Sequence, residues 1–308
     1  MADYLQKIGN FSVKALETFC TEGYFDMYNF GKEDIIINSA SIQARRERSS
    51  LVKSNKRRYE FEFSPTNGFL ASPDLLMTNC ELKLSFDRSS AKHTLIQLAD
   101  GELGGELEIL DCYALTEYIS SNSIQEHFSK IQSEPILYEY EETEVLIKSL
   151  PTDDTTIRID NIRGGNTPKY LFAGVLPTKL LQGEWNDCCT RFQQNHVVEF
   201  NISLNGNSVN GYPLSVTENL PCYALSKFNS VTSRHHNVFA GALIDDTLFK
   251  YNFLWSHKFE AESTSSGWIG IDLKLARAWT EPMSLVIWII NPTAITLDQY
   301  FQIEKINL

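Results

Sequence analysis

Short runs in which polar and apolar residues alternate constrain the fold of this chain more than any other feature. Residues 57–63 read RRYEFEF, residues 80–86 read CELKLSF, and residues 198–204 read VEFNISL. Because successive side chains of a strand point to opposite faces of a sheet, this alternation predicts half-buried strands. Further candidate strands are 106–110, 138–150, 155–159, 170–175, 248–254, 268–275, 284–290 and 299–306.

Turn residues separate these strands, and helical patterns are few. Asn205-Gly206 follows one strand directly and predicts a tight hairpin turn. Only residues 13–19 and 123–132 show a helical pattern, and Ser123 with Glu126 forms a capping-box motif before the second. Since helices do not alternate with strands, a parallel α/β sheet is not expected.

The strand count sets the expected fold class and domain organisation. About 12–15 short strands with Gly, Pro and Asn turns are typical of a jelly-roll sandwich. We therefore predict an all-β jelly-roll sandwich, as a double jelly roll with minor helices. A single jelly roll with an inserted β domain is the alternative. The predicted domains are residues 1–150, a first jelly-roll-like domain, and residues 151–308, a C-terminal jelly roll.

The sequence shows no catalytic or metal-binding motif. It has no GxSxG elbow, no HExxH pair, no P-loop and no dinucleotide-binding fingerprint. The adjacent His235 and His236 would point to opposite faces of a strand, and none of the six cysteines forms a CxxC pair. We therefore expect a protein that is not an enzyme and that binds no cofactor or metal.

One basic segment stands out in an acidic chain. The 39 acidic and 27 basic residues give a net charge of −12. Such a segment predicts contact with an acidic partner, either nucleic acid or a neighbouring subunit, although it also fits a solvated loop. Its members are Arg45, Arg46, Arg48, Lys53, Lys56, Arg57 and Arg58.

The ends and apolar runs of the chain suggest a soluble product. Its first residues, MADYLQKIGN, lack the basic and apolar regions of a signal peptide. No run reaches the roughly 20 apolar residues that a membrane span needs. We therefore expect reduced thiols, synthesis in a reducing compartment and no membrane span.

The order of motifs in residues 135–308 resembles the capsid proteins of Polinton/Maverick elements and adintoviruses, in the adenovirus-hexon lineage. The motifs are Val145-Leu146-Ile147-Lys148, Asp160-Asn161-Ile162, 168–175 (PKYLFAGV), Gly183-Glu184-Trp185, the strand 197–204 with Asn205-Gly206, Tyr212-Pro213-Leu214, and the strand pair within 267–290. The first 134 residues are similar to that family only in outline.

The resemblance implies a structural capsid protein that assembles with itself and with other capsid proteins into an icosahedral shell. A double jelly roll of this lineage would form homotrimeric capsomers. A vertex, or penton, protein would instead form homopentamers. The protein would be located in the virion, would be synthesised in the host cytoplasm or nucleus, and could contact genome DNA through the basic segment.

Two further expectations concern the surface. Trp185, Phe192, Trp268 and Trp279 are candidate anchors of a subunit interface, or else core residues. A jelly-roll module that binds a glycan or attaches to a host remains the alternative function, because loops of β-sandwiches can carry ligand sites.

Overall fold

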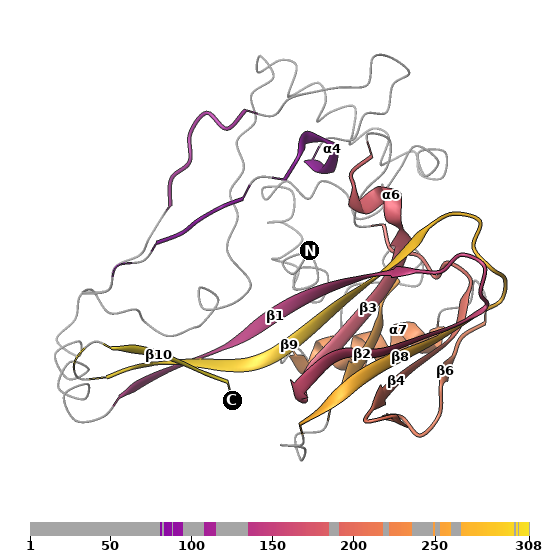
Figure 1. The fold of residues 1–308 in the computed structure, drawn as a ribbon. Helices are drawn as coiled ribbons and strands as arrows, with labels where there is room; N and C mark the ends of the chain where they lie inside the picture. Colours follow the sequence, from indigo (N-terminus) through magenta and orange to yellow (C-terminus); the bar gives the residue numbers. More distant parts are fainter. Residues whose placement is uncertain are drawn as a thin grey trace.

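Two antiparallel sheets, stacked face to face, make up most of what the computed structural model of this chain describes (Figure 1). The described residues are 81, 83–87, 89–94, 108–114, 135–184, 191–217, 222–235, 249, 253–259, 266–298, 300 and 302–307. Short helices are α4 (Ala91–Thr94) and α6 (Thr178–Leu181), and a longer one is α7 (Cys222–His235).

Each sheet takes its strands from distant parts of the sequence. The first, which we call the β9 sheet, has the order β1 (Ile136–Leu150), β9 (Met283–Leu297), β3 (Tyr170–Pro177) and β7 (Trp255–Lys258), with β10 (Ile303–Asn307) also on β9. The second, the β8 sheet, has the order β2 (Thr156–Asn166), β8 (Ser266–Leu275), β4 (Val197–Leu204) and β5 (Asn207–Ser208), with β6 (Leu214–Ser215) also on β4.

The strand pairs are nested, which defines the fold as a jelly roll. β1 pairs with β9, β2 with β8, β3 with β7, and β4 with β5 and β6, all antiparallel. Successive pairs fall in alternate sheets, as in a single long hairpin rolled up on itself. Rolling adds the contacts of β3 with β9 and of β4 with β8. The predicted all-β jelly-roll sandwich is therefore confirmed.

β1 connects the two predicted domains. It precedes the boundary expected at residue 150, yet all fifteen of its residues are in register with β9, from Ile136 opposite Leu297 to Leu150 opposite Met283. The division into residues 1–150 and 151–308 stays a prediction, as does a second jelly roll, because most of the first 134 residues lie outside the described ranges.

Aromatic rings fill the space between the sheets and extend to α7. The ring of Phe200 on β4 stacks on Trp255 of β7, with centroids 4.9 Å apart and planes at 3°. Trp255 contacts Phe253 edge-on at 5.1 Å, and Phe253 contacts Phe249 at 5.0 Å. Phe249 in turn meets Phe228 of α7 at 5.6 Å. All five rings are buried, so burial of apolar area holds the sheets and α7 together.

The outward faces of the two sheets differ in polarity. Trp255, which faces the other sheet, is in register with Ala173, and Ala173 with Ile287. The alternate residues of the β9 sheet therefore point outward, and they are apolar and buried: Phe172, Val286, Trp288 and Ile290. On the β8 sheet the outward positions are polar or charged: Arg158, Glu199, Asn201, Asp272 and Lys274.

The outward face of the β9 sheet carries a second aromatic layer. Phe192 meets Trp288 edge-on, with centroids 5.3 Å apart, and Phe228 of α7 meets Phe172 at 6.1 Å. Gly174 makes room for this layer, because a Cβ there would lie 2.5 Å from Phe192 Cδ1 and 2.7 Å from Leu254 Cδ2. The β9 sheet is thus buried on both faces, whereas the β8 sheet is buried on one.

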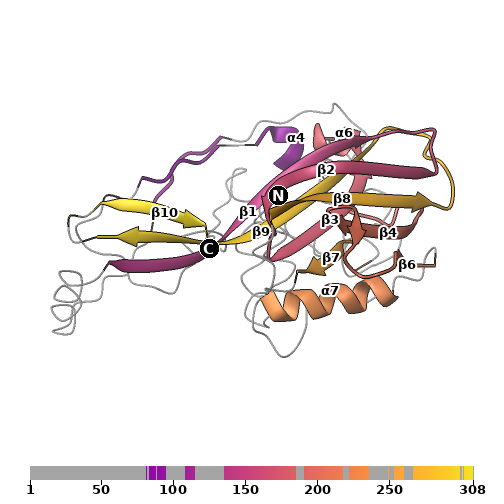
Figure 2. The ribbon, with the colours of Figure 1, turned by 60° about the horizontal axis from the view of Figure 1, so that its bottom comes forward.

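Beyond the sandwich, β1, β9 and β10 continue as a three-stranded arm (Figures 1 and 2). The arm comprises the paired residues 136–140, 293–297 and 303–307. Pro292 lies between Ile290, the last residue of β9 that pairs with β3, and Thr293, the first residue of β9 that pairs with β10. A residue without an N–H group is tolerated at such a gap in the ladder.

Some expected elements are absent or displaced. The described residues of the strands expected at 80–86 and 106–110 belong to no ladder, and Leu84, Phe86, Ile109 and Leu110 are exposed. The strand expected at 248–254 instead begins at Trp255, and α7 was not predicted. Alternation predicts a strand only where a neighbouring strand accepts its backbone hydrogen bonds. The helices expected at 13–19 and 123–132 lie outside the described residues.

The expected hairpin turn at Asn205-Gly206 is confirmed. Leu204 pairs with Asn207, and both turn residues have positive φ, 53° at Asn205 and 82° at Gly206. This is the conformation that a two-residue hairpin turn requires, and it explains the Asn-Gly sequence.

Candidate functional site

The seven basic residues of the predicted contact segment, from Arg45 to Arg58, lie outside the described part of the chain, and their role stays a prediction. Among the candidate interface aromatics, Phe192 and Trp279 are core residues, with exposed fractions of 0% and 6%. Trp185 also lies outside the described residues. Only Trp268 is partly exposed on the surface.

Trp268 lies on the outward, polar face of the β8 sheet, beside a bulge in β2. Ile159 is paired with Ile271 and Arg163 with Ile269, so residues 160–162 of β2 stand opposite the single residue Gly270. Asn161, at the centre of the bulge, has a φ of 52°. The bulge therefore brings two extra polar side chains, Asp160 and Asn161, next to the strand that carries Trp268.

A shallow pocket of about 380 Å³ opens between this bulge and the indole ring. Arg158 Nε donates to Asp160 Oδ1 at 2.9 Å and lies 3.8 Å from Asp272 Oδ1. This hydrogen bond and the two carboxylates raise the pKa of Arg158. The pocket thus joins an aromatic ring, a fixed guanidinium, a carboxylate and an amide, with Arg158, Asp160, Asn161 and Trp268 as its lining.

Three of the positions around the partly exposed ring of Trp268 are glycines. Its partner on β2 is Gly164. A Cβ at Gly206 would lie 3.7 Å from Cη2 and Cζ2 of the indole, and one at Gly270 would lie 3.4 Å from Cζ3. The backbone around the tryptophan is held by Asn205, whose Oδ1 accepts from the Trp268 N–H at 3.0 Å.

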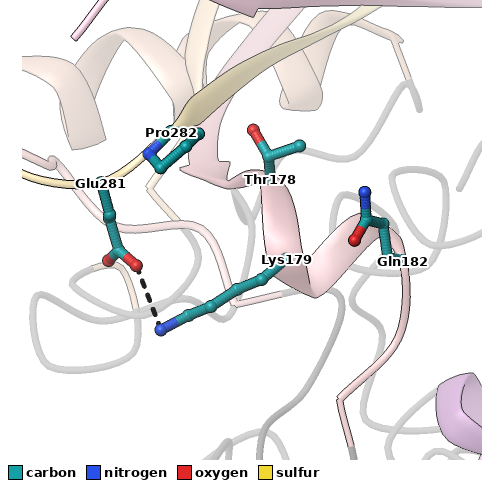
Figure 3. A pocket seen from close by; sticks show the side chains of 5 residues that line it. All are labelled: Thr178, Lys179, Gln182, Glu281 and Pro282. Atoms are coloured by element: carbon teal, nitrogen blue, oxygen red, sulfur yellow. Dashed lines mark ion pairs between the residues drawn. The ribbon is translucent and has the colours of Figure 1, made fainter.

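A second, smaller pocket of about 190 Å³ lies between α6 and the start of β9 (Figure 3). Lys179 reaches across it to Glu281, with the Nζ to Oε2 distance at 3.1 Å. Thr178 donates its N–H to the Pro282 carbonyl at 2.9 Å, which fixes α6 against the loop. The ion pair neutralises both charges, and the lining residues include no aromatic ring. We therefore interpret this pocket as part of the contact that joins α6 to the start of β9.

Exposed apolar side chains gather on the arm. Ile303 is 67% exposed and Tyr300, at the turn between β9 and β10, is 72% exposed. Leu137 and Ile306 are also exposed. The turn itself is fixed, since Asp298 Oδ1 accepts from the N–H groups of Tyr300 and Gln302 at 2.9 and 2.8 Å. The arm therefore presents apolar groups on an ordered backbone.

Three acidic residues of β1 are paired with basic residues of β2, of β10 and of the segment before β3. Glu141 binds Lys169 at 2.9 Å, Glu142 binds Lys305 of β10 at 2.7 Å, and Glu144 lies 3.3 Å from Arg163 of β2. These pairs surround the region where the arm leaves the sandwich. Such carboxylates serve to join elements, and they do not converge on a cleft as the acids of a glycosidase do.

Beside α7, two tyrosines and a histidine form a small cluster. Tyr212 and Tyr223 interact through a side-chain hydrogen bond, which together with burial raises the pKa of Tyr223. Lys227 Nζ lies 5.9 Å from the Tyr223 ring centroid. His257 meets Phe259 edge-on at 4.7 Å, and burial, with the nearby Lys227 ammonium, lowers the pKa of His257 to about 4.

Within the described ranges, no three His, Cys, Asp or Glu side chains come close enough to hold a metal ion. In the same ranges, none of the helices has the length and apolar character needed to cross a membrane.

The strand order and the buried aromatic layers define the chain as a jelly-roll protein of the β-sandwich class. No protein-family model and no curated protein sequence matches it.

Solved structures that align with the chain include viral capsid proteins. A chain of the PBCV-1 virus capsid is 14% identical, with the alignment covering 60% of this chain and 54% of that one, at a TM-score of 0.34. A Sputnik virophage chain is 8% identical, covering 56% and 39%, at 0.34. The mavirus major capsid protein is 10% identical, covering 62% and 44%, at 0.33. The chain thus spans between 39% and 54% of the length of these three.

Sequence reasoning singled out Trp268 but missed its surroundings. The bulge at 160–162 leaves no periodic signal, because it interrupts the alternation from which strands are predicted. The arm was predicted only as the isolated strands 138–150 and 299–306. The strand predicted at 284–290 did not include the second half of β9, which forms the middle strand of the arm.

Proposed function

We propose that this chain is a structural capsid protein, related to those of Polinton/Maverick elements and adintoviruses, that assembles into homotrimeric capsomers of an icosahedral shell. The nested jelly-roll pairing of β1 to β9 is the observation that carries the proposal. It supports the family resemblance of residues 135–308, which was drawn from motif order alone. The function of such a protein is packing and surface complementarity, without catalysis or a cofactor.

The arm is the proposed contact with a second copy. The side chains of Ile303 and Tyr300 are largely exposed to solvent in the single subunit. Exposed apolar side chains on a strand are suited to burial in a permanent subunit interface. The three-stranded extension projects away from the sandwich, so it can reach a neighbour without moving the core (Figure 2). In the shell the arm would pack against the adjacent subunit of the capsomer.

The basic segment has a proposed place at a subunit boundary or on the inner surface of the shell. Its seven positive charges stand in a chain of net charge −12, whose copies repel one another at long range. At a subunit boundary the segment would offset that repulsion. On the inner surface it would neutralise genome phosphates, with binding that salt weakens steeply.

Residues 1–150 would provide the first jelly-roll-like domain of a double jelly roll, with residues 151–308 as the second. In this arrangement three subunits present six jelly rolls, which suits a hexagonal capsomer. A single jelly roll with an inserted domain would favour a fivefold vertex instead. The virion is the proposed location, with other capsid proteins as partners.

Multi-angle light scattering of the purified chain tests this function. We expect a trimer as the smallest stable species, and we expect the Ile303→Ser and Tyr300→Ser variants to shift it toward monomer. Matched controls are Ile147→Ser and Tyr212→Ser, because those side chains are 53% and 62% exposed but lie outside the arm. Controls that dissociate as readily as the arm variants would contradict the role of the arm. Wild-type protein that stays monomeric at every concentration would contradict the function.

A further inference from the structure

The indole of Trp268 lies in a setting that subunit packing does not explain. It belongs to the outward face of the β8 sheet, whose other side chains are charged or polar and paired with one another. Lys274 Nζ lies 2.7 Å from Glu199 Oε1, and Asn201 Nδ2 donates to Asp272 Oδ2 at 3.0 Å. A single aromatic ring on a polar face is common by itself, and what distinguishes Trp268 is the set of polar groups that share its pocket.

Three glycines lie around the indole, which is partly exposed. Gly164 faces it from β2, Gly206 lies at the adjacent turn, and Gly270 follows two residues later on the same strand. The φ angle of Gly206 favours glycine, but no positive φ accounts for Gly164 or Gly270. A Cβ at Gly270 would lie 2.8 Å from Ser203 Oγ and 3.3 Å from the Ile159 carbonyl oxygen, so close packing within the β8 sheet accounts for that glycine. Gly164 is under no such constraint, because the nearest atom to its Cβ would be 3.8 Å away, and its effect is to leave the position opposite the indole without a side chain.

The polar groups of the pocket are fixed beside the ring. Asp160 and Asn161 are brought there by the bulge, and the guanidinium of Arg158 is oriented by its 2.9 Å hydrogen bond to Asp160. Together they offer a carboxylate acceptor, an amide with both donor and acceptor, and free guanidinium donors within one opening of about 380 Å³. Polar groups that converge beside an aromatic ring can fix the orientation of a small ligand, although this pocket is shallower than most ligand sites.

We propose that this pocket binds a saccharide, with the C–H face of a pyranose ring packed on Trp268. A pyranose has an apolar face that matches an indole, and it has hydroxyl groups around its edge that both donate and accept hydrogen bonds. Asp160 and Asn161 would accept from and donate to those hydroxyls, and Arg158 would donate. The site is open, which suits a terminal sugar of a glycan chain.

The charge of the site selects this class over a nucleotide. A nucleobase could also stack on an indole. However, the carboxylates of Asp160 and Asp272 flank the guanidinium and would repel the phosphate of a nucleotide. A neutral ligand with hydroxyl groups avoids this repulsion. The inference goes beyond assembly, and it does not depend on the oligomeric state of the chain.

Saturation-transfer difference NMR of the purified full chain tests the proposal. The probes are glucose, galactose, mannose and N-acetylglucosamine at millimolar concentration, with adenosine monophosphate as the comparison. We expect at least one sugar to receive saturation, mainly at the C–H protons of one ring face, and the nucleotide to receive none. Absence of signal from all four sugars, or equal signal from the nucleotide, would overturn the proposal.

Variants assign the signal to the pocket. Trp268→Ala should weaken sugar binding about tenfold or more, as expected for loss of an aromatic anchor. Gly164→Leu, which adds a side chain opposite the ring and next to Asn161, should weaken it as well. Tyr212→Ala, which removes an exposed ring elsewhere, should leave binding unchanged. Thermal unfolding of each variant confirms that it is folded. Folded Trp268→Ala protein that binds like wild type would overturn the proposal.

Discussion

Lys305, in the last strand of the chain, donates through its Nζ to both carboxylate oxygens of Glu142, at 2.8 and 2.7 Å. The two residues lie on β10 and β1, which are separated by β9, so the pair joins the two strands that flank β9, next to the point where the arm begins. The hydrogen bond raises the pKa of Lys305. Its contribution is therefore present below the unfolded pKa of a lysine and is lost as pH rises through the higher folded pKa.

Breaking this pair should loosen β10 locally and change global stability little. Because both side chains are about half exposed, Glu142→Gln should reduce the free energy of unfolding by only about 0.2–1 kcal/mol. Hydrogen exchange of the β10 amides should become faster. Glu199→Gln, which breaks the 2.7 Å pair with Lys274 on the β8 sheet, is the control and should leave β10 exchange unaltered. Unchanged exchange in the Glu142 variant would show that the pair does not hold the strand.

Truncation of two tryptophans of the chain should destabilise the fold by very different amounts. Trp288 is fully buried against Phe192, so Trp288→Ala should lower the free energy of unfolding by about 3–5 kcal/mol. Trp268 lies on the polar face with glycines beside it, and Trp268→Ala should cost less than about 1 kcal/mol. Urea unfolding followed by circular dichroism measures both. Similar losses in the two variants would contradict the assignment of their environments.

Gly174 should tolerate no side chain. A Cβ there would lie 2.5 and 2.7 Å from Phe192 and Leu254, so Gly174→Ala should destabilise the fold by about 1–3 kcal/mol through overpacking. Gly164→Ala is the matched control, because the nearest atom to its Cβ would be 3.8 Å away. Thermal unfolding should separate the two variants clearly. If Gly174→Ala were as stable as the control, Phe192 and Leu254 would have to move aside without cost, and the prediction of a tightly packed layer would be wrong.

Stability should fall as pH drops from about 6.5 toward 4 because of His257. Burial and Lys227 lower its pKa to about 4, so the unfolded chain takes up this proton at a higher pH than the folded chain does. The loss is complete near pH 4 and amounts to at most about 3 kcal/mol. Urea unfolding across this range should show a shallower slope in His257→Gln. An identical slope in wild type and variant would exclude His257 as the cause.

The basic segment predicts a defect in assembly with an intact fold. Replacing Arg45, Arg46, Arg48 and Lys53 with serine should weaken assembly or DNA packaging, while the circular dichroism spectrum stays unchanged. Higher salt should reduce genome binding steeply, and it should affect a partly buried subunit contact less. A variant that assembles and packages normally at physiological and raised salt would identify the segment as a solvated loop.

The alternation of polar and apolar residues was enough to predict the class of fold, but it did not predict which strands pair. β4 and β8 were predicted almost to their ends, because one of their faces is buried and the other is solvated. Strand alternation cannot reveal that β1 pairs with β9, since that pairing joins residues more than a hundred positions apart. The strand predicted at 284–290 ended before β9 does, and the sequence alone does not show that Pro292 falls in the gap between the β3 and β10 pairs.

α7 and the Trp268 pocket were missed for related reasons. Ala224, Phe228 and Val231 are the buried face of α7, and their spacing of four and three is helical, but polar residues between them hide the signal. The pocket depends on a bulge and on two strands distant in sequence, which only the tertiary pairing brings together. The position of such a surface pocket depends on which residues of two strands pair, and the sequence does not show this. The core strands can be predicted, because their composition and the alternation of their residues are visible in the sequence.

Negative-stain electron microscopy of the purified full chain, with symmetry-free averaging of single particles, tests the central claim most directly. A homotrimeric capsomer predicts compact particles whose class averages show threefold symmetry. Fivefold averages would place the protein at the vertices of a shell and would correct the proposed capsomer. Single, unassembled subunits at every protein concentration and salt condition would contradict the account of this chain as a self-assembling capsid protein.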